Sequence, residues 1–449
     1  MKFGTDGVRG LANKELTARL AFELGQAGAL VLAKKTKRPR ILIAQDTRLS
    51  SDMLVAALTA GLCSVGADVI NLGVLPTPAI AALVKEYNAA AGVMMSASHN
   101  PFYDNGIKFF DGNGYKLPDE VEGEIVEQMK QLDNLDLPSG EDVGRMLPAN
   151  DALPCYVDFL KNCLGNINIK GLTFALDCAH GATYKAAPRV FVEMGAKLHL
   201  MGDAPDGVNI NEGCGSTHME ALAEFVKGND GVNAGFAFDG DGDRCLAVDE
   251  MGNVVDGDMI MSIIATHMLE KGQLAHNTLV ATVMSNLGLF KAAESHGFNV
   301  EQTKVGDRYV LERMKEGGFV LGGEQSGHII QLSHQTTGDG ILAALTLAGI
   351  MAETGKTLSQ LNKVMVKMPQ TLKNAKIPND VKDKVLSDPA VLAEINLAHS
   401  KFEGRGRVLI RPSGTEPLVR VMIEGENLAE IEGEAVRLAE LLEKAASCG

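Results

Sequence analysis

Residues 40–73 read RILIAQDTRLSSDMLVAALTAGLCSVGADVINLG, and this stretch decides the fold. The apolar run at 40–46 predicts a strand, MLVAALTAGLCSV predicts a helix, and GADVINLG at 66–73 predicts a second strand. Gly66 stands where the helix must end, a position that favours a residue tolerant of left-handed backbone dihedrals. Because strand, helix and strand in succession imply parallel pairing through a crossover helix, the stretch indicates an α/β fold.

The same pattern occurs twice more along the chain. The second copy begins with LTFALD at 172–177 and the third with LVATVM at 279–284. Each continues into a helix, a glycine (Gly195 or Gly297) and a second strand. Three such units predict three similar α/β domains, although βα repeats also arise within any large α/β protein.

The C-terminal part of the chain follows a different pattern. We interpret VKMPQTLKNAKIP at 366–378 as a linker, RVLIRP and LVRVMIEG as strands, and Leu428 to about Ala446 as an amphipathic helix. Apolar residues three or four positions apart predict a buried helix stripe of Leu428, Ile431, Ala435, Leu438 and Leu442. These elements predict a smaller α+β domain. The predicted domain limits are 1–150, 151–253, 254–367 and 368–449.

The composition is that of a folded protein and argues against several functions. With 449 residues, 45% hydrophobic and 22% charged, the chain can form about three cores and is not disordered. A net charge of −15 repels nucleic-acid phosphates and anionic lipid surfaces, so we expect neither partner. No window approaches 18 uninterrupted apolar residues, and the start, MKFGTDGVRG, lacks the apolar stretch of a signal peptide. We therefore expect a cytoplasmic location.

Three aspartates crowd one short loop. The stretch FAFDGDGDRCLAVD at 236–249 alternates Asp239, Asp241 and Asp243 with glycines between two apolar runs. Because like charges this close repel one another, a hard cation is their natural neutraliser. An EF-hand calcium loop also alternates aspartates, but its sixth position demands glycine and here holds Arg244. We predict Mg²⁺ with a phosphate nearby, and an acidic turn without a ligand remains the alternative.

Hydroxyl groups stand at the end of another predicted strand. GVMMSASHNPFYDNGIKFF at 92–110 leads from an apolar run into Ser96, Ser98 and His99. Either serine is a candidate nucleophile, but His99 is expected to be a poor base for Ser98, since adjacent side chains on a strand point apart. A plain turn at the strand end is the alternative. The chain lacks the GxSxG and GxxxxGK[ST] motifs of acyl transfer and nucleotide hydrolysis.

Two further loops carry polar groups suited to a sugar phosphate. RVLIRPSGTEPLVRVMIEG at 407–425 predicts a phosphate cradle, because guanidinium forks and the donors of a Ser-Gly-Thr turn grip phosphate oxygens. LGGEQSGHII at 321–330 places Glu324, Ser326 and His328 between two predicted strands, where they suit sugar hydroxyls. The alternatives are a surface hairpin with stray arginines and a structural turn.

Taken together, these segments resemble a known family. KFGTDGVRG, SASHNP, DGDGDR, GEQSGH and RPSGTEPLVR, in this order, resemble the α-D-phosphohexomutase superfamily, and within it the members that act on glucosamine phosphate. The resemblance spans essentially the whole chain. It implies a four-domain enzyme in which three similar α/β domains and a smaller C-terminal α+β domain surround a central cleft.

The resemblance also assigns roles to residues by position. Ser98 would carry the phosphoryl group, which spacing alone does not separate from Ser96. The metal ligands would be Ser98, as its phosphate oxygen, with Asp239, Asp241 and Asp243. Of the residues near the transfer, Arg9 would stabilise charge, and Lys108 and His328 would share the proton roles. The substrate-binding residues would be Arg244, Glu324, Ser326, Arg411, Ser413, Gly414, Thr415 and Arg420.

The implied reaction interconverts glucosamine 6-phosphate and glucosamine 1-phosphate and feeds UDP-N-acetylglucosamine synthesis. It would proceed through a phosphoserine enzyme, with a sugar 1,6-bisphosphate as intermediate and activator. Such a reaction needs mainly alignment and charge stabilisation. Glucose and mannose phosphates are alternative substrates, and the sequence leaves open whether the protein is a monomer or a homodimer.

Two other functions fit parts of the sequence. A haloacid-dehalogenase-like phosphatase would use Asp239 as nucleophile and Asp241 as acid, but it leaves the SASHNP and RPSGTE loops unexplained. A metal-dependent sugar-phosphate sensor could use the same fold without turnover. An acid-stable phosphoenzyme would exclude the first alternative, and turnover would exclude the second.

Overall fold

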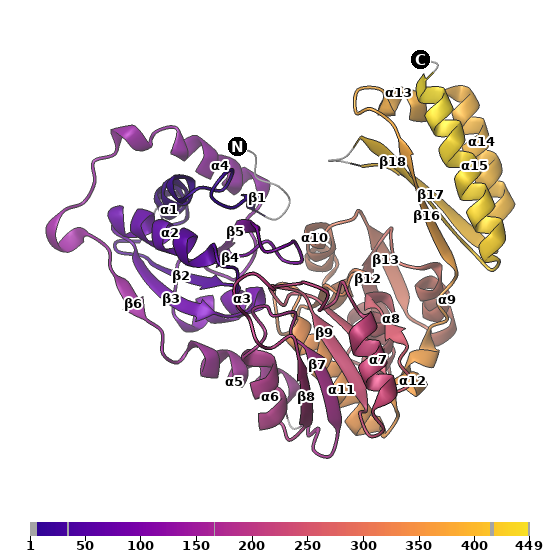
Figure 1. The fold of residues 1–449 in the computed structure, drawn as a ribbon, viewed down its shortest axis with the longest axis horizontal. Helices are drawn as coiled ribbons and strands as arrows, with labels where there is room; N and C mark the ends of the chain where they lie inside the picture. The colour runs from indigo at the N-terminus through magenta and orange to yellow at the C-terminus, as the bar shows by residue number, and fades with distance from the viewer. Residues whose placement is uncertain (1–6, 34–35, 166, 414–416, 448–449) are drawn as a thin grey trace. The chain divides into compact units, whose positions relative to one another are not determined.

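The structure is a computed structural model that describes residues 7–33, 36–165, 167–413 and 417–447. Its contacts divide the chain into two compact units. The large unit comprises Met1–Met284 and Phe298–Val364, and the small unit comprises Ser285–Gly297 and Met365–Gly449. Figure 1 shows the elements of both.

The first sheet contains the unit predicted at 40–73. Strand β2 (Arg40–Gln45) leads through helix α2 (Ser51–Ser64) to β3 (Asp68–Val74), and the two strands pair in parallel as expected. Strand β4 (Ala91–Met95) pairs in parallel on the other side of β2, and β5 (Asp104–Asp111) runs antiparallel beside β4. Strands β1 (Val8–Leu11) and β6 (Met146–Pro148) complete the six-stranded order β1-β5-β4-β2-β3-β6.

The second and third sheets repeat this arrangement. The second has the order β11-β10-β9-β7-β8 and the third β13-β12-β14-β15, each with three parallel strands followed by an antiparallel one. The predicted repeat is therefore confirmed as β7-α6-β8 and β12-α9-β13. The bounds are β7 Thr173–Asp177, α6 Ala186–Glu193, β8 Lys197–Met201, β9 Ala234–Phe238, β10 Cys245–Asp249, β11 Val254–Val255, β12 Thr278–Thr282, α9 Leu287–His296, β13 Asn299–Thr303, β14 Leu321–Gly323 and β15 Ile329–Gln331.

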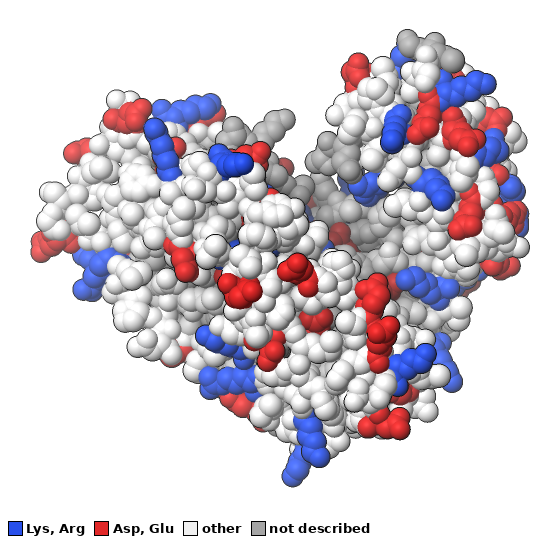
Figure 2. Space-filling view, viewed as in Figure 1, with Lys and Arg blue, Asp and Glu red and all other residues white. Residues whose placement is uncertain are grey.

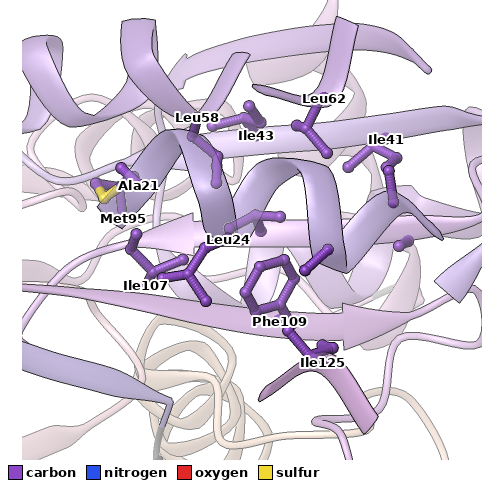
Figure 3. Packing of buried hydrophobic residues seen from close by; sticks show 14 of the residues in the cluster. Ala21, Leu24, Ile41, Ile43, Leu58, Leu62, Met95, Ile107, Phe109 and Ile125 are labelled. Carbon is purple, nitrogen blue, oxygen red and sulfur yellow. The ribbon is translucent and has the colours of Figure 1, made fainter. Parts of the chain in front are cut away.

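Helices cover both faces of the first sheet, which explains why its strands are almost continuously apolar. On one face α1 (Ala18–Leu32), α2 and α4 (Asp119–Met129) pack against Ile43 and Phe109, as Figure 3 shows. Gly28 of α1 permits this approach, since a Cβ there would lie 2.7 Å from Cε1 of Phe109. On the other face lies α3 (Thr77–Glu86).

The remaining helices of the large unit connect and cover the sheets. Each repeat ends its first helix at a glycine in the left-handed region, with φ of +90° at Gly66, +96° at Gly195 and +83° at Gly297, as the sequence predicts. The other helices are α5 Ala152–Leu164, α7 Glu220–Gly228, α8 Gly257–Glu270, α10 Asp307–Gly317, α11 Gly340–Thr354 and α12 Leu358–Leu361.

The small unit is the predicted α+β domain with one correction. Residues 366–378 are not simply a linker, because they contain strand β16 (Gln370–Lys376). This edge strand of the antiparallel sheet β16-β18-β17 buries only Thr371 and Ala375, so its sequence lacks an apolar pattern. The small unit also contains α9, which follows β12 in the chain, and α13 Lys382–Leu386, α14 Pro389–Phe402, β17 Gly406–Pro412, β18 Leu418–Gly425 and α15 Leu428–Ser447.

Helix α15 forms where the sequence predicts it. Ile431, Ala435, Leu438 and Leu442 are buried in the core of the small unit, as expected. Leu428 is wrongly placed in that stripe, since as the first residue of the helix it lies half exposed.

The distribution of surface charge and the length of the helices are relevant to binding of nucleic acids and membranes. Lysines and arginines are interspersed with acidic residues over the face drawn in Figure 2, so no patch of one sign dominates that face. Among the described residues, no single helix has the length and apolar composition to cross a membrane, although α11 together with Leu358–Val364 would, across a 92° bend.

A buried carboxylate links two helices of the large unit. Asp339 caps α11 by accepting the N–H of Leu342 at 3.0 Å, and its Oδ2 accepts the hydroxyl of Tyr156 from α5 at 2.8 Å. Burial raises the pKa of Asp339 to about 6, against the effect of these hydrogen bonds.

This raised pKa predicts a pH-dependent contribution to stability. Because the folded value lies above the ordinary value of 3.8, the contribution is fully present below pH 3.8 and is lost as pH rises through 6. We expect the free energy of unfolding of the wild type, relative to Asp339→Asn, to fall by roughly 1 kcal/mol between pH 5 and pH 7. Urea denaturation of both proteins at both pH values measures this, and a pH-independent difference would contradict it.

Candidate active site

The three functional loops of the large unit occupy equivalent places in their sheets. The β4–β5 loop carries Ser98, the β9–β10 loop carries Asp239 to Asp243, and the β14–β15 loop carries Glu324 to His328. Each loop joins the last parallel strand of its sheet to the antiparallel strand beside it. The repeated topology therefore presents three different sets of side chains from one structural position.

The three aspartates form one buried cluster. Asp239, Asp241 and Asp243 each offer a carboxylate oxygen within 4.8 Å of the other two, and all three side chains are almost fully buried. Within the part of the chain that the structure describes, the Oδ1 atoms of Asp241 and Asp243 have no hydrogen-bond partner. Buried carboxylate oxygens without partners are costly, and a divalent cation with a preference for oxygen would satisfy both. The residues present therefore fit a metal site.

The surroundings of the aspartates give them different acidities. Burial, followed by repulsion from Asp241 and Asp243, raises the pKa of Asp239 well above its usual value. Burial would also raise the pKa of Asp241, but the ammonium of Lys108 and the hydroxyl of Thr77 each lie 2.6 Å from its Oδ2 and hold that pKa below its usual range. The net negative charge of the cluster is therefore only partly compensated by protein groups.

Ser98 lies directly against this cluster. Its Oγ donates to Oδ2 of Asp239 at 2.6 Å, and the side chain is buried. The backbone of Ser98 is left-handed, with φ of +53°, which is uncommon for a residue other than glycine, asparagine or aspartate. The loop therefore brings a hydroxyl into contact with the candidate metal ligands.

His99 lies closer to Ser98 than the sequence predicts. Its Nδ1 is 3.3 Å from Oγ of Ser98. The expectation that the two side chains point apart is wrong, because β4 ends at Met95 and the left-handed turn at Ser98 replaces the alternation of a strand. Burial lowers the pKa of His99 to about 4, helped by the nearby guanidinium groups of Arg244 and Arg9. His99 is therefore neutral at pH 7.

Basic side chains surround the carboxylates. The backbone N–H of Arg244 donates to Oδ1 of Asp239 at 3.1 Å, and its guanidinium lies 3.3 Å from His99. Nδ1 of His328 is 3.5 Å from Oδ2 of Asp243, and its Nε2 accepts the N–H of Gly338 at 3.0 Å. These contacts place Arg244, Lys108 and His328 around one anionic cluster.

Glu324, Ser326 and Arg9 are the remaining predicted site residues of the large unit. Glu324 accepts the N–H of Gly306 at 3.0 Å, and its Oε2 is 3.4 Å from the exposed hydroxyl of Ser326. Arg9 lies on β1 opposite Gly106, with an exposed side chain. These polar groups are accessible to a ligand.

The predicted phosphate loop belongs to the small unit. Arg411 on β17 and Arg420 on β18 are paired directly opposite each other, and Ser413 closes the hairpin by donating its N–H to Leu418. Burial, and then repulsion from Arg420, lowers the pKa of Arg411, and the buried Nε of Arg411 has no hydrogen-bond partner among the described residues. Two facing guanidinium groups favour an anion between or beside them. Gly414 and Thr415 lie outside the described residues.

Sequence reasoning missed several residues at the site. Thr77 donates both its hydroxyl and its backbone N–H to Asp241, and Asp307 lies 3.5 Å from Nε2 of His328. Both residues stand at the beginning of a helix, Thr77 of α3 and Asp307 of α10. The sequence signal that could have found them is a polar residue at a predicted helix start that follows a loop. Thr77 and Asp241 belong to connections of two different sheets, and Asp307 and His328 to two different connections of the third sheet, so a single sequence does not reveal either contact.

Comparisons with known proteins find relatives over nearly the whole chain. Four family models match, described as phosphoglucomutase/phosphomannomutase alpha/beta/alpha domains I, II and III and the C-terminal domain, over residues 1–136, 154–252, 256–368 and 372–441. Phosphoglucosamine mutase of Clostridium perfringens (strain SM101) is 56% identical over 442 residues, covering 98% of each chain.

Solved structures share the fold over nearly the whole chain. A phosphoglucomutase/phosphomannomutase family protein of Burkholderia thailandensis has a TM-score of 0.81 at 24% identity, covering 98% of this chain and 97% of the other. An N-acetylphosphoglucosamine mutase of Aspergillus fumigatus, in complex with GlcNAc-6P and magnesium, has a TM-score of 0.70 at 18% identity, covering 99% and 96%. The predicted four-part fold is thereby confirmed, and the chain belongs to the phosphoglucosamine mutase branch of the phosphoglucomutase/phosphomannomutase family, whose members are isomerases.

Proposed function

We propose that this enzyme interconverts glucosamine 6-phosphate and glucosamine 1-phosphate through a phosphorylated Ser98 and a sugar 1,6-bisphosphate. The observation that carries the proposal is the 2.6 Å contact between Oγ of Ser98 and Asp239, inside a carboxylate cluster with two unpartnered oxygens. In this proposal the product feeds UDP-N-acetylglucosamine synthesis in the cytoplasm. The four domains would keep the limits 1–150, 151–253, 254–367 and 368–449.

The first step transfers the phosphoryl group of phospho-Ser98 to the free hydroxyl of the bound sugar phosphate. The bond from phosphorus to Oγ of Ser98 breaks, a bond from phosphorus to the sugar oxygen forms, and the hydroxyl proton passes to a basic group. The bisphosphate then turns over within the site, and its other phosphoryl group returns to Ser98 by the reverse chemistry. Both transfers use the same side chains.

The other residues around the cluster would each have a separate role in the reaction. Arg9 and Arg244 would stabilise the charge on the transferring group. Lys108 and His328, which lie against Asp241 and Asp243, would share the proton transfers. Glu324 and Ser326 would bind the sugar hydroxyls. The phosphate that does not react would be held by Arg411, Ser413, Gly414, Thr415 and Arg420.

Asp239, Asp241 and Asp243 would hold Mg²⁺, with an oxygen of phospho-Ser98 completing the protein ligands. The ion would supply charge neutralisation for the transferring phosphoryl group. The A. fumigatus protein that shares the fold was solved with magnesium and a sugar phosphate, which supports this choice of ion and of ligand class. The relatives named phosphoglucosamine mutase support the amino sugar.

Ser98→Ala is expected to abolish turnover, because no other side chain would accept the phosphoryl group. Incubation with glucose 1,6-bisphosphate, followed by peptide mass spectrometry, should locate an acid-stable phosphate on residue 98 of the wild type. Ser96→Ala removes the other candidate serine and should still carry its label on Ser98, although more slowly, because the Ser96 hydroxyl accepts the N–H of Ser98. Acid-labile label on Asp239 would instead favour the phosphatase mechanism, and near-native turnover of Ser98→Ala would place the nucleophile elsewhere.

Asp243→Asn is expected to weaken Mg²⁺ binding by at least about tenfold, since changes even outside the direct ligands of metal sites cost 10–100-fold. Isothermal titration of the metal-free protein with Mg²⁺ measures this without reference to activity. Asp249→Asn serves as control, because Asp249 is also buried but lies outside the cluster, at the end of strand β10 that follows the aspartate loop. Equal affinity in both variants would exclude the cluster as the metal site.

The choice of sugar can be tested directly. With a catalytic amount of the matching bisphosphate, we expect kcat/KM to be highest for glucosamine 6-phosphate and lower for glucose and mannose 6-phosphates. A higher value for either neutral sugar would assign the protein to a different mutase activity while leaving the phosphoserine chemistry in place. No turnover with any of them would favour the sugar-phosphate sensor.

A further inference from the structure

Arg48 is a fully buried arginine that has no part in the proposed chemistry. All of its guanidinium donors are nevertheless used. Nε bonds to Oδ2 of Asp46 at 2.7 Å. The four remaining N–H groups donate to backbone carbonyls of the Ser98 loop, namely those of Ser98 at 2.7 Å, Asn100 at 2.8 Å, Asp104 at 3.0 Å and Pro101.

Asn211 lies in the connection between β8 and α7 of the second sheet and binds the same loop. Its Nδ2 donates to the carbonyl of Ser98 at 2.9 Å and to that of Asn100 at 3.1 Å. The carbonyls of Ser98 and Asn100 therefore each accept one bond from Arg48 and one from Asn211. Asn211 is itself anchored, because its backbone N–H donates to the carbonyl of Ala179 at 2.9 Å.

The other side of the Ser98 peptide is held by the partner of Arg48. The N–H of Ser98 donates to Oγ of Ser96 at 2.9 Å, and that hydroxyl donates to Oδ2 of Asp46 at 2.6 Å. Asp46 thus connects to the N–H of Ser98 through Ser96, and to its carbonyl through Arg48. Both backbone polar groups of Ser98 are tied to one buried ion pair.

We infer that Arg48 and Asn211 are positioning residues that hold Ser98 in its left-handed conformation and so aim Oγ at Asp239. A non-glycine residue in this conformation persists only where its surroundings determine it, and here six hydrogen bonds to the loop's carbonyls do so. This inference rests on the proposed role of Ser98. It explains why an arginine is buried here, since a lysine cannot present five donors in a fixed fork.

The aspartate loop between β9 and β10 also packs against Ser98, which further restricts the backbone conformation of that serine. A Cβ at Gly240 would lie 2.5 Å from the carbonyl oxygen of Ser98, so the aspartate loop packs directly on the backbone that Arg48 and Asn211 hold. We call these two residues the clamp. A rotation of that carbonyl would move Ser98 and would also disturb the packing of Gly240 against it. The clamp therefore sets the distance between the nucleophile and the metal ligands.

Two variants test the inference. Asn211→Ala removes two of the bonds without burying a charge, and Arg48→Lys keeps the charge beside Asp46 but loses the fork. We expect the single-turnover rate constant for phosphoryl transfer from phospho-Ser98 to the sugar to fall at least tenfold in the first and more in the second. This rate constant does not depend on the fraction of active enzyme. KM for the sugar phosphate and the Mg²⁺ affinity should change less than threefold.

Controls separate positioning from general destabilisation. Arg405→Lys, which alters an exposed arginine paired with Glu430 in the small unit, should leave the rate constant unchanged. Because Arg48 and Asn211 bind the same two carbonyls, the double variant should lose less than the product of the single losses. If Arg48→Lys does not fold, Asn211→Ala alone decides.

The inference fails if Asn211→Ala keeps the wild-type single-turnover rate constant, or if its loss appears as a change in KM or Mg²⁺ affinity. That outcome differs from failure of the proposed function, in which Ser98→Ala itself would remain active. An inactive Ser98→Ala together with a fully active Asn211→Ala would preserve the phosphoserine and reject the clamp.

Discussion

The site depends on the electrostatic cost of packing three carboxylates into one buried loop. Without compensation, the repulsion among Asp239, Asp241 and Asp243 in a poorly solvated environment would oppose folding of the loop. The protein compensates in part, through the ammonium of Lys108 and the hydrogen bonds of Thr77 and Arg244. Two carboxylate oxygens of the cluster find no hydrogen-bond partner in residues 7–33, 36–165, 167–413 and 417–447. The large unit brings these compensating groups to one place from the strands and connections of two different sheets.

The repeated sheet topology positions the functional side chains of the large unit. A parallel strand followed by an antiparallel neighbour leaves a loop at one edge of the sheet, and each copy places its functional side chains in that loop. Because the backbone framework is the same in each copy, the sequence of the loop alone decides whether it supplies the hydroxyl of Ser98, the three aspartates, or Glu324, Ser326 and His328. Helix starts near these loops add Thr77 and Asp307 from outside the repeat.

Periodicity and glycine placement were sufficient to predict the three α/β units, because buried parallel strands and left-handed helix ends leave strong local signals. Strand β16 was missed, because an edge strand with two buried residues has no apolar pattern. The aspartates and serine were found as separate motifs. Their contact, the position of His99 and the role of Arg48 depend on a left-handed backbone and on bonds between residues as far apart as Ser98 and Asn211, which no local pattern records.

The facing arginines of the small unit have a thermodynamic consequence. Arg411 and Arg420 oppose each other across β17 and β18, so their mutual repulsion weakens the hairpin that carries them. An anion bound there removes that repulsion, and by linkage the affinity for the anion and the resistance of the hairpin to unfolding rise together. Under the proposed function, β17 and β18 would therefore be more stable with the non-reacting phosphate bound than without it, and the same repulsion would favour release of the product.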